Sequence, residues 1–482
     1  MSRSRISITV MGALALAACT ADRIDPVSPL AVSPARSVSS VAPTRYIVLA
    51  KNSGFKSDFA TRVAALGGTV ESLHKGAGIA VVSNLSAAAA SKVGAFSEVS
   101  DLQSDADVAL DAPAAANTAN VANVSINSVG NPATAILYGW QWNMQLINAN
   151  AAWAAGKLGD AGVTVAILDT GIDYDALDLN GLVDLSRSTS FVPSDDAIAT
   201  TFFPTRNKIS DFNGHGTNVA TQVSSKAFAC AGVTSKTTLI GVKVLGASGS
   251  GSTSGVLNGV LWAADHGADV ANMSLGSSFA KAGNGRFVSL INRVFNYAAS
   301  KGTLIVVAAG NAGADLDHNG NVESAYCDAT HVVCVSSVGP ALSTDNPNMV
   351  ASYSNFGRSA ISVAAPGGNA DLENLTVSNW PWGPDFASWV WSLCSKTYIA
   401  GTSGGAPVLP CAAGNRLVGE IGTSQASPHV AGLAALLVSV QGHGRPAQIK
   451  NAILKSAIDL GQPGTDPFYG RGRIDVARAL GL

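Results

Sequence analysis

The stretch GVTVAILDTGID, residues 162–173, joins an unbroken apolar run to an aspartate and a glycine. A run without polar alternation is typical of a strand that is buried on both faces. Similar runs follow along the chain, and stretches with helical periodicity separate them. The alternation predicts an α/β fold with a mostly parallel sheet and helices on both faces. The further runs lie at 238–245, 268–275, 302–310 and 331–339, and the helical stretches at 254–267 and 288–302.

Polar side chains stand where several of these elements end or begin. Asp169 ends the first apolar run, and Asn311 follows the run at 302–310. His215 lies between two glycines at the expected start of a helix, in DFNGHGTNVA. Because ligands of parallel sheets bind beyond the carboxyl ends of the strands, these groups are candidates for a shared site. Taken singly, Asp169 and His215 are also explained as turn or capping residues.

Two serines lie in similar small-residue turns, Ser403 in YIAGTSGGAP and Ser424 in EIGTSQASPH. A serine hydroxyl becomes a good nucleophile when an imidazole takes its proton, and the imidazole needs a carboxylate that orients and stabilises it. Asp169, His215 and one serine would supply this chemistry in chain order. The Asn311 amide would then donate to the developing oxyanion.

The chain resembles the subtilisin-like serine peptidases in five motifs that occur in order: ILDTGID, NGHGT, NMSLG, AAGN and GTSQASPHVAG. The resemblance covers a peptidase domain at 138–482. It implies a catalytic triad of Asp169, His215 and Ser424, with Asn311 as the oxyanion donor. It also implies that substrate backbone pairs with one short segment and that a second segment forms a wall of the first specificity pocket. These segments are Ser274, Leu275 and Gly276, and Ala308, Ala309 and Gly310.

The context of the two serines favours Ser424 as the nucleophile. Ser424 precedes an apolar helical stretch at 430–440, whose N-terminus would present backbone N–H groups to an oxyanion. Pro428 fits the first turn of that helix. Ser403 lies in GTSGGAP, which resembles the GDSGGP of chymotrypsin-like enzymes, but Thr402 replaces the aspartate and no long helix follows. We therefore expect Ser403 to be structural.

The implied function is that of an exported serine endopeptidase, made as a zymogen, which hydrolyses peptide bonds through an acyl-enzyme on Ser424. One alternative is a non-catalytic surface binding protein that kept the fold, and the complete set of site residues argues against it. A second alternative is a serine-carboxyl peptidase that acts at Ser403. Its chemistry uses Glu and Asp in place of His, so an acid pH optimum would favour it.

Ahead of the peptidase domain, residues 45–110 show a β-α-β-β-α-β order of elements, which is ferredoxin-like and α+β in class. The segment is similar to the inhibitory propeptides of the same family. The resemblance therefore implies that it is an intramolecular inhibitor. Residues 111–137 are Ala, Asn, Ser and Val in short polar alternation, and we interpret them as a linker.

The chain begins with MSRSRISITVMGALALAACTAD, in which two arginines precede a short apolar run that ends in small residues. The pattern predicts an export signal at 1–19. The sequence LAAC that ends at Cys19 resembles a bacterial lipobox, so we expect a lipid anchor there, with ordinary cleavage as the alternative. Residues 20–44 are rich in Pro, Ser and Ala and are interpreted as a tether. We expect a lipid-anchored precursor at the bacterial cell envelope and a mature peptidase that is extracellular or periplasmic.

The charge of the chain gives no sign of a nucleic-acid partner, since the net charge is −2 and only 13% of the residues are charged. The expected partners are protein or peptide substrates, and we expect a monomer. In an exported protein the cysteine spacings predict two local disulfides, Cys327 with Cys334 and Cys394 with Cys411. Cys230 lies in an apolar setting and is expected to stay a free, inert thiol.

The expected chemistry requires no cofactor, and calcium is an open alternative. Asp315, Asp317 and Asn319 match the opening D-x-D-x-N-G of a calcium loop, where alternate oxygens face inward. The closing glutamate is missing because Tyr326 occupies its place.

An insertion at 369–421 carries four tryptophans, Trp380, Trp382, Trp389 and Trp391. We interpret it as a locally packed hairpin held by one of the disulfides. An aromatic rim of the substrate cleft is the alternative interpretation.

Overall fold

The structure is a computed structural model that describes residues 44–482 apart from 53, 111–114, 122–130, 277, 281–284, 319, 325, 342–344, 370–387, 404 and 413–414. The expected export signal, the lipid site at Cys19 and the tether therefore lie outside the described residues, except for Thr44.

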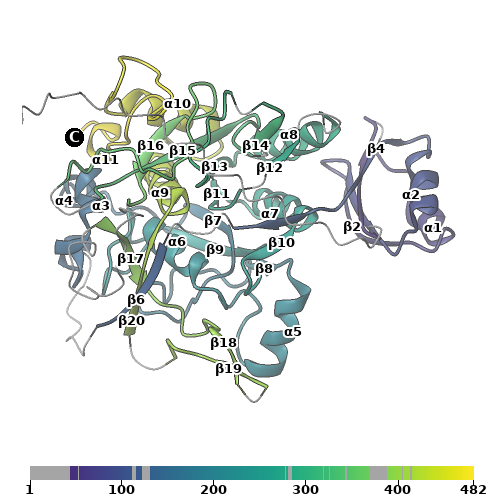
Figure 1. Ribbon diagram of the computed structural model, residues 1–482, viewed down its shortest axis with the longest axis horizontal. Coiled ribbons are helices and arrows are strands. Elements are labelled where there is room, and N and C mark those ends of the chain that lie inside the picture. Colours follow the sequence, from purple (N-terminus) through teal and green to yellow (C-terminus); the bar gives the residue numbers. More distant parts are fainter. Residues whose placement is uncertain are drawn as a thin grey trace, which may run out of the picture. The chain divides into compact units, whose positions relative to one another are not determined.

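A seven-stranded parallel sheet organises the chain between residues 164 and 366 (Figure 1). All five apolar runs of the sequence are strands of this sheet, and every neighbouring pair within it is parallel, which confirms the predicted α/β fold. The strands in spatial order are β16 (Val363–Pro366), β15 (Val332–Val338), β13 (Leu304–Ala308), β11 (Val270–Met273), β7 (Thr164–Asp169), β9 (Thr238–Lys243) and β8 (Thr189–Ser190).

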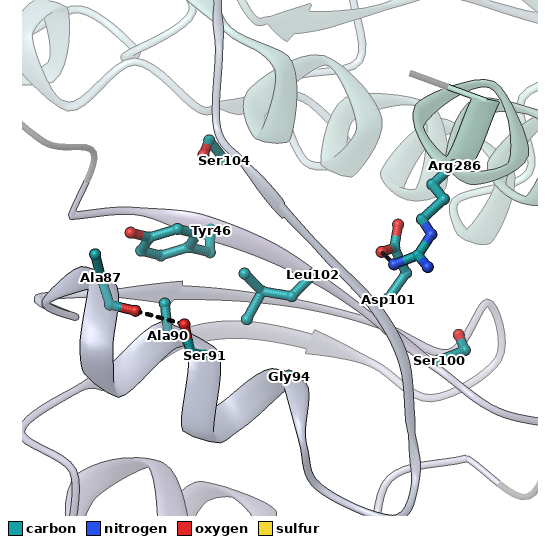
Figure 2. Close-up of a pocket in the computed structure, with 10 residues that line it drawn as sticks. All are labelled: Tyr46, Ala87, Ala90, Ser91, Gly94, Ser100, Asp101, Leu102, Ser104 and Arg286. Atoms are coloured by element: carbon teal, nitrogen blue, oxygen red, sulfur yellow. Dashed lines mark hydrogen bonds and ion pairs between the residues drawn. The ribbon is translucent and has the colours of Figure 1, made fainter. Parts of the chain in front are cut away.

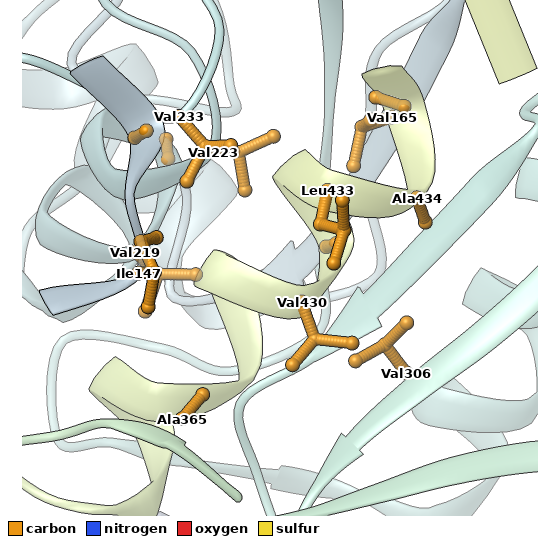
Figure 3. Close-up of a cluster of buried hydrophobic side chains, with 14 of the residues drawn as sticks. Ile147, Val165, Val219, Val223, Val233, Val306, Ala365, Val430, Leu433 and Ala434 are labelled. Atoms are coloured by element: carbon orange, nitrogen blue, oxygen red, sulfur yellow. The ribbon is translucent and has the colours of Figure 1, made fainter. Parts of the chain in front are cut away.

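Helices cover both faces of the sheet. Because successive residues of each strand point to opposite sides, neighbouring residues of one strand pack against different helices. Val165 of β7 packs in one apolar cluster with α6, α9 and α10, whereas Ala166 packs in another with α7 and α8. Figure 3 shows Val430 of α9 beside Val306 of β13 in the first cluster. These helices are α6 (His215–Val223), α7 (Thr253–Asp265), α8 (Gly285–Ser300), α9 (Thr423–Gln441) and α10 (Pro446–Ser456).

The first part of the described chain folds as a four-stranded antiparallel sheet with two helices and its own apolar cluster. The elements follow in the predicted β-α-β-β-α-β order, and the strands lie in the spatial order β2-β3-β1-β4. Their bounds are β1 (Tyr46–Ala50), α1 (Phe59–Ala64), β2 (Thr69–His74), β3 (Ile79–Ser83), α2 (Ala87–Gly94) and β4 (Val99–Ser104).

The segment interpreted as a linker contains a strand, β6 (Ala115–Val121), which the sequence did not indicate. It pairs antiparallel with β20 (Asn415–Ile421), and β20 pairs on its other side with β17 (Val390–Leu393). The physical reason is that an exposed strand edge offers unpaired N–H and C=O groups to any extended chain, whatever its side chains. A further short strand, β5 (Asp107–Ala109), pairs antiparallel with β10 (Ser250–Ser252).

The two predicted disulfides are confirmed, and Cys230 is a free, buried cysteine. Trp389 and Trp391 are buried, as expected for a packed insertion, whereas Trp380 and Trp382 lie outside the described residues.

Within the described part of the chain, no helix has both the length and the apolar character that crossing a membrane requires. The remaining elements are α3 (Trp142–Leu146), α4 (Ala149–Ala154), α5 (Pro193–Phe202), α11 (Val476–Ala479), β12 (Ser278–Ala280), β14 (Val322–Ser324), β18 (Gly401–Ser403) and β19 (Ala406–Val408), with short 3₁₀ turns at Pro132–Thr134 and Tyr138–Trp140.

Candidate active site

Asp169 and His215 form a buried hydrogen-bonded pair at the carboxyl end of the sheet. Asp169 is the last residue of β7, and His215 is the first residue of α6. Nδ1 of His215 lies 2.8 Å from Oδ1 of Asp169, and the backbone N–H of Thr170 donates to the same oxygen at 2.7 Å. The carboxylate therefore fixes the imidazole with Nδ1 toward itself, which leaves Nε2 to act as a base.

Glycines and a buried aspartate let the chain place His215 so close to β7. Gly214 has a φ of 99°, a region that favours glycine, and a Cβ on Gly216 would lie only 2.1 Å from the carbonyl oxygen of Gly171. Asp211 accepts hydrogen bonds from Gly214 N, Thr217 N and the Thr217 hydroxyl, which satisfies the first turn of α6.

The negative charges around His215 raise its pKa more than burial lowers it. Burial lowers the pKa of His215, but the charge and hydrogen bond of Asp169, with smaller contributions from Glu420 and Asp211, raise it to about 9. Nε2 is buried and has no hydrogen-bond partner among the described residues. The imidazolium is therefore the stable form at neutral pH, and the neutral base becomes abundant under alkaline conditions.

Ser424 is the second residue of α9 and is buried. Its hydroxyl donates to the carbonyl oxygen of Ser274 at 3.2 Å, and no hydrogen bond joins it to His215. Pro428 has no N–H to offer within the helix, so the carbonyl oxygen of Ser424 accepts from the Ser274 hydroxyl instead, at 2.7 Å. Catalytic hydrogen bonds often close only when substrate binds, so this geometry agrees with a nucleophile at rest.

Asn311 and the backbone of Ser424 lie close to Gly422. The side-chain oxygen of Asn311 accepts from both the N–H and the hydroxyl of Thr423 at 2.9 Å, which fixes the direction of the amide. A Cβ built on Gly422 would lie 3.4 Å from Asn311 Nδ2 and 3.6 Å from Ser424 N. Asn311 Nδ2 and Ser424 N thus lie near one point beside Gly422.

Glu420 is a functional candidate of this region that escaped the sequence analysis. Glu420, in β20, accepts a hydrogen bond at 2.6 Å from Nε2 of Gln425, and both residues are buried. Burial raises the pKa of Glu420 to about 7, the charges of Asp169 and Asp211 add to this, and His215 opposes it. The sequence carries no signal for the burial of Glu420, because a glutamate next to small residues is ordinarily expected on the surface.

His429 supports the start of α9 in its neutral form. Its Nδ1 lies 2.8 Å from the carbonyl oxygen of Gln425, and its Nε2 lies 2.9 Å from Nδ2 of Asn143. Burial lowers the pKa of His429 to about 4, against a small opposing effect of the Gln425 carbonyl. Nδ1 therefore donates and Nε2 accepts, so His429 holds the helix rather than taking part in proton transfer.

The segments expected to bind substrate follow β11 and β13 at the same end of the sheet. Gly276 pairs with Ala109 of this chain in an antiparallel bridge, and Leu110 N donates to Gly249 O at 2.8 Å. Ala308 and Ala309, at the end of β13, are buried. Ala109 of the chain itself therefore already pairs with one of the expected substrate edges, and residues 107–109 pair with β10 beside it.

The remaining expected site residues lie elsewhere. Ser403 is exposed in β18. Asp315 accepts from His318, and Asp317 accepts from Arg358 N and from Ser359, while Asn319 lies outside the described residues. Among the residues that the structure describes, no group of three or more His, Cys, Asp or Glu could hold a metal ion. The calcium loop stays a prediction.

Comparisons with known proteins agree with this geometry. A model of the subtilase family matches residues 160–472. The chain is 34% identical over 342 residues to alkaline elastase YaB of a Bacillus species, covering 70% of this chain and 69% of that protein. It is 31% identical over 343 residues to thermitase of Thermoactinomyces vulgaris, covering 70% and 95%.

Among solved structures, the epidermin leader peptide processing serine protease of Staphylococcus aureus has a similar fold. It matches with a TM-score of 0.71 at 22% identity, covering 92% of this chain and 98% of that one. Fervidolysin of Fervidobacterium pennivorans matches with a TM-score of 0.65 at 20% identity, covering 92% and 61%.

Proposed function

Since the chain belongs to the subtilase family of serine peptidases, we propose that it cleaves peptide bonds with Asp169, His215 and Ser424 as its catalytic triad. The Ser424 hydroxyl attacks the substrate carbonyl while His215 Nε2 takes its proton. Asn311 Nδ2 and Ser424 N donate to the oxyanion that forms. His215 then gives the proton to the leaving amine, and water hydrolyses the acyl-enzyme in a second round of the same steps.

The 2.8 Å contact between His215 and Asp169, with Nε2 left for the nucleophile, is the observation that carries this proposal. The test is hydrolysis of a chromogenic peptide by the Ser424→Ala protein, with Ser403→Ala as the matched control on an exposed strand. We expect Ser424→Ala to lose on the order of 10⁴–10⁶ in rate and Ser403→Ala to keep most of its activity. Equal rates for Ser424→Ala and the parent would refute the triad.

We further propose that residues 45–110 inhibit the enzyme as part of a zymogen. Two observations support this: Ala109 pairs with Gly276 of the expected substrate edge, and a set of contacts joins the N-terminal part of the chain to α7 and α8. Asp105 accepts from the N–H of Ser254 at 2.8 Å and from its hydroxyl at 2.6 Å. His74 Nε2 lies 2.7 Å from Asp265 Oδ2.

Other contacts of the proposed inhibitor are weaker. Figure 2 shows Arg286 of α8 beside Asp101 of β4, 3.2 Å apart, among the residues that line a shallow pocket. The Arg286 side chain is 75% exposed, so this ion pair contributes little to the binding free energy of the proposed inhibitor.

Self-cleavage is proposed between Leu110 and Ala115. Leu110 N is bonded to Gly249 O, and Ala115 pairs with Ile421, which closely precedes Ser424. Ala115 thus lies beside the strand that leads to Ser424. A cut there would separate the peptidase domain both from its inhibitor and from a lipid anchor at Cys19.

Fractionation of cells tests this second proposal. We expect the parent to shed a domain of roughly 365 residues, a size that follows from an accessible cut near residue 115. The Ser424→Ala protein should stay full length and membrane-associated. Equal processing of the Ser424→Ala protein, in the absence of another protease, would refute self-cleavage.

Several finer expectations complete the proposal. The substrates are proteins or peptides, bound along Ser274–Gly276 by backbone pairing that gives affinity without strong sequence choice. The enzyme is exported, acts as a monomer and needs no organic cofactor. Calcium at Asp315 and Asp317 and a lipid at Cys19 stay proposals.

A further inference from the structure

Gln425 follows the proposed nucleophile directly and is fully buried. Its Nε2 donates to Oε2 of Glu420 at 2.6 Å, whereas its Oε1 has no hydrogen-bond partner among the described residues. A buried amide oxygen without a partner is unusual and calls for a physical explanation.

The unpartnered oxygen borders the proposed oxyanion site. A Cβ built on Gly422 would lie 2.8 Å from Gln425 Oε1, and the same point lies 3.4 Å from Asn311 Nδ2. The backbone N–H of Ser424 lies 3.6 Å from it. An acceptor oxygen at this border repels a developing oxyanion, whereas an N–H group in its place would stabilise it.

The carboxyl group of Glu420 determines which end of the Gln425 amide faces this space. An ionised carboxylate only accepts hydrogen bonds, so it holds Nε2 and leaves Oε1 toward Gly422. A protonated carboxyl group has an O–H that donates to Oε1. Turning the amide over then gives Oε1 a donor and directs Nε2 to the oxyanion site, whereas the ionised carboxylate offers Oε1 no donor.

We propose that Gln425 is a third donor of the oxyanion site and that Glu420 is the positioning residue that switches it on when its carboxyl group is protonated. The proposal rests on the proposed triad, because it assigns a role next to Ser424. The proton comes from solvent, and no other group is consumed.

The charged groups that face Glu420 set the pH range of this switch. They are His215 of α6, Asp169 at the end of β7 and Asp211 just before α6. Burial, together with the two aspartates, raises the pKa of Glu420 to about 7. The donor state therefore predominates below this pH and the acceptor state above it. Protonation of Glu420 also removes a negative charge that raises the pKa of His215.

The test compares Glu420→Gln with the parent at pH 10, where His215 is mostly neutral in both proteins. The new amide has an N–H that can donate to Gln425 Oε1 at every pH, so the donor arrangement no longer depends on protonation. We expect kcat toward a peptide p-nitroanilide to rise about tenfold at pH 10, with KM changed less than about twofold, because the gain arises only in the transition state. At pH 6 the ratio should approach one, because the parent is then protonated at Glu420.

The matched background is Gln425→Met, which has neither a donor nor an acceptor amide. In that background Glu420→Gln should change kcat at pH 10 less than about twofold. A tenfold gain in the Gln425→Met background, or a ratio near one in the parent background, would overturn the proposal. Thermal unfolding checks that each variant is folded. If Gln425→Met does not fold, Gln425→Ala takes its place. If neither variant folds, the ratio of kcat for Glu420→Gln to kcat for the parent decides.

Active-site titration with a fluorophosphonate separates this inference from the proposed function. Each kcat is normalised to the titrated fraction. A parent that does not react refutes the triad, whereas full reaction without a pH-dependent ratio refutes only the switch.

Discussion

The contact between Asp105 and α7 gives a quantitative prediction for the proposed zymogen. Asp105 accepts from the N–H and the hydroxyl of Ser254, and Ala106 O accepts from Thr253 N at 2.8 Å. The inhibitor thus supplies acceptors to the positive N-terminal end of a helix of the peptidase domain. The Asp105 side chain is only 3% exposed, so its bonds are shielded from water.

The size of the effect follows from these bonds. A hydrogen bond to a charged group contributes about 1.5–3 kcal/mol. We expect Asp105→Ala to weaken inhibition by about 3 kcal/mol, which is roughly a hundredfold in Ki. Asp105→Asn keeps one acceptor and should weaken it about tenfold. Asp107 is exposed in β5, so Asp107→Asn is the matched control and should leave Ki unchanged.

The assay adds separately produced residues 45–110 to the processed enzyme and measures hydrolysis of a chromogenic peptide. A Ki for Asp105→Ala within about threefold of the parent would refute the reasoning, given the hydrogen-bond energies above. An equal loss with Asp107→Asn would show that net charge, rather than the helix cap, holds the inhibitor.

Three further predictions concern the site and its support. Asn311→Leu should lower kcat about 10²–10³-fold with little change in KM, because one oxyanion donor is lost. Steady-state kinetics measures this, and an unchanged kcat would exclude Asn311 from the oxyanion site. Since Asp169 and its neighbours raise the pKa of His215 to about 9 against the effect of burial, kcat should rise with pH up to about 9, and a pH–rate profile already flat at pH 6 would contradict this. Replacing both Cys394 and Cys411 by serine should lower the free energy of unfolding by about 3 kcal/mol in denaturant titrations, and an unchanged midpoint would contradict a stabilising role.

The sequence was informative wherever a short stretch carries its own physical constraint. The unbroken apolar runs identified the central strands, because a strand that is buried on both faces has no solvent-facing polar residues. The glycines around His215 and the helix after Ser424 marked the candidate site, because close backbone approach and a helix N-terminus both leave local signatures. The spacing of the cysteines was sufficient to predict both disulfides.

Features that depend on distant pairing could not be predicted. β6 contains small and polar residues without a strand-like pattern, and it is a strand only because β20 offers it an edge. Glu420 is buried because β20 turns it toward the site, and no neighbour in sequence indicates this. The bond between His429 and Asn143 joins residues 286 positions apart.

Reaction of the processed enzyme with a fluorophosphonate, followed by mass mapping of the labelled peptide, tests the central claim most directly. The probe reacts with an activated serine hydroxyl and forms a stable adduct. A single adduct on Ser424, with Ser403 unmodified, is the predicted result. An adduct on Ser403, or no adduct in a protein that still cleaves peptides, would contradict the assignment of Asp169, His215 and Ser424 as the catalytic triad.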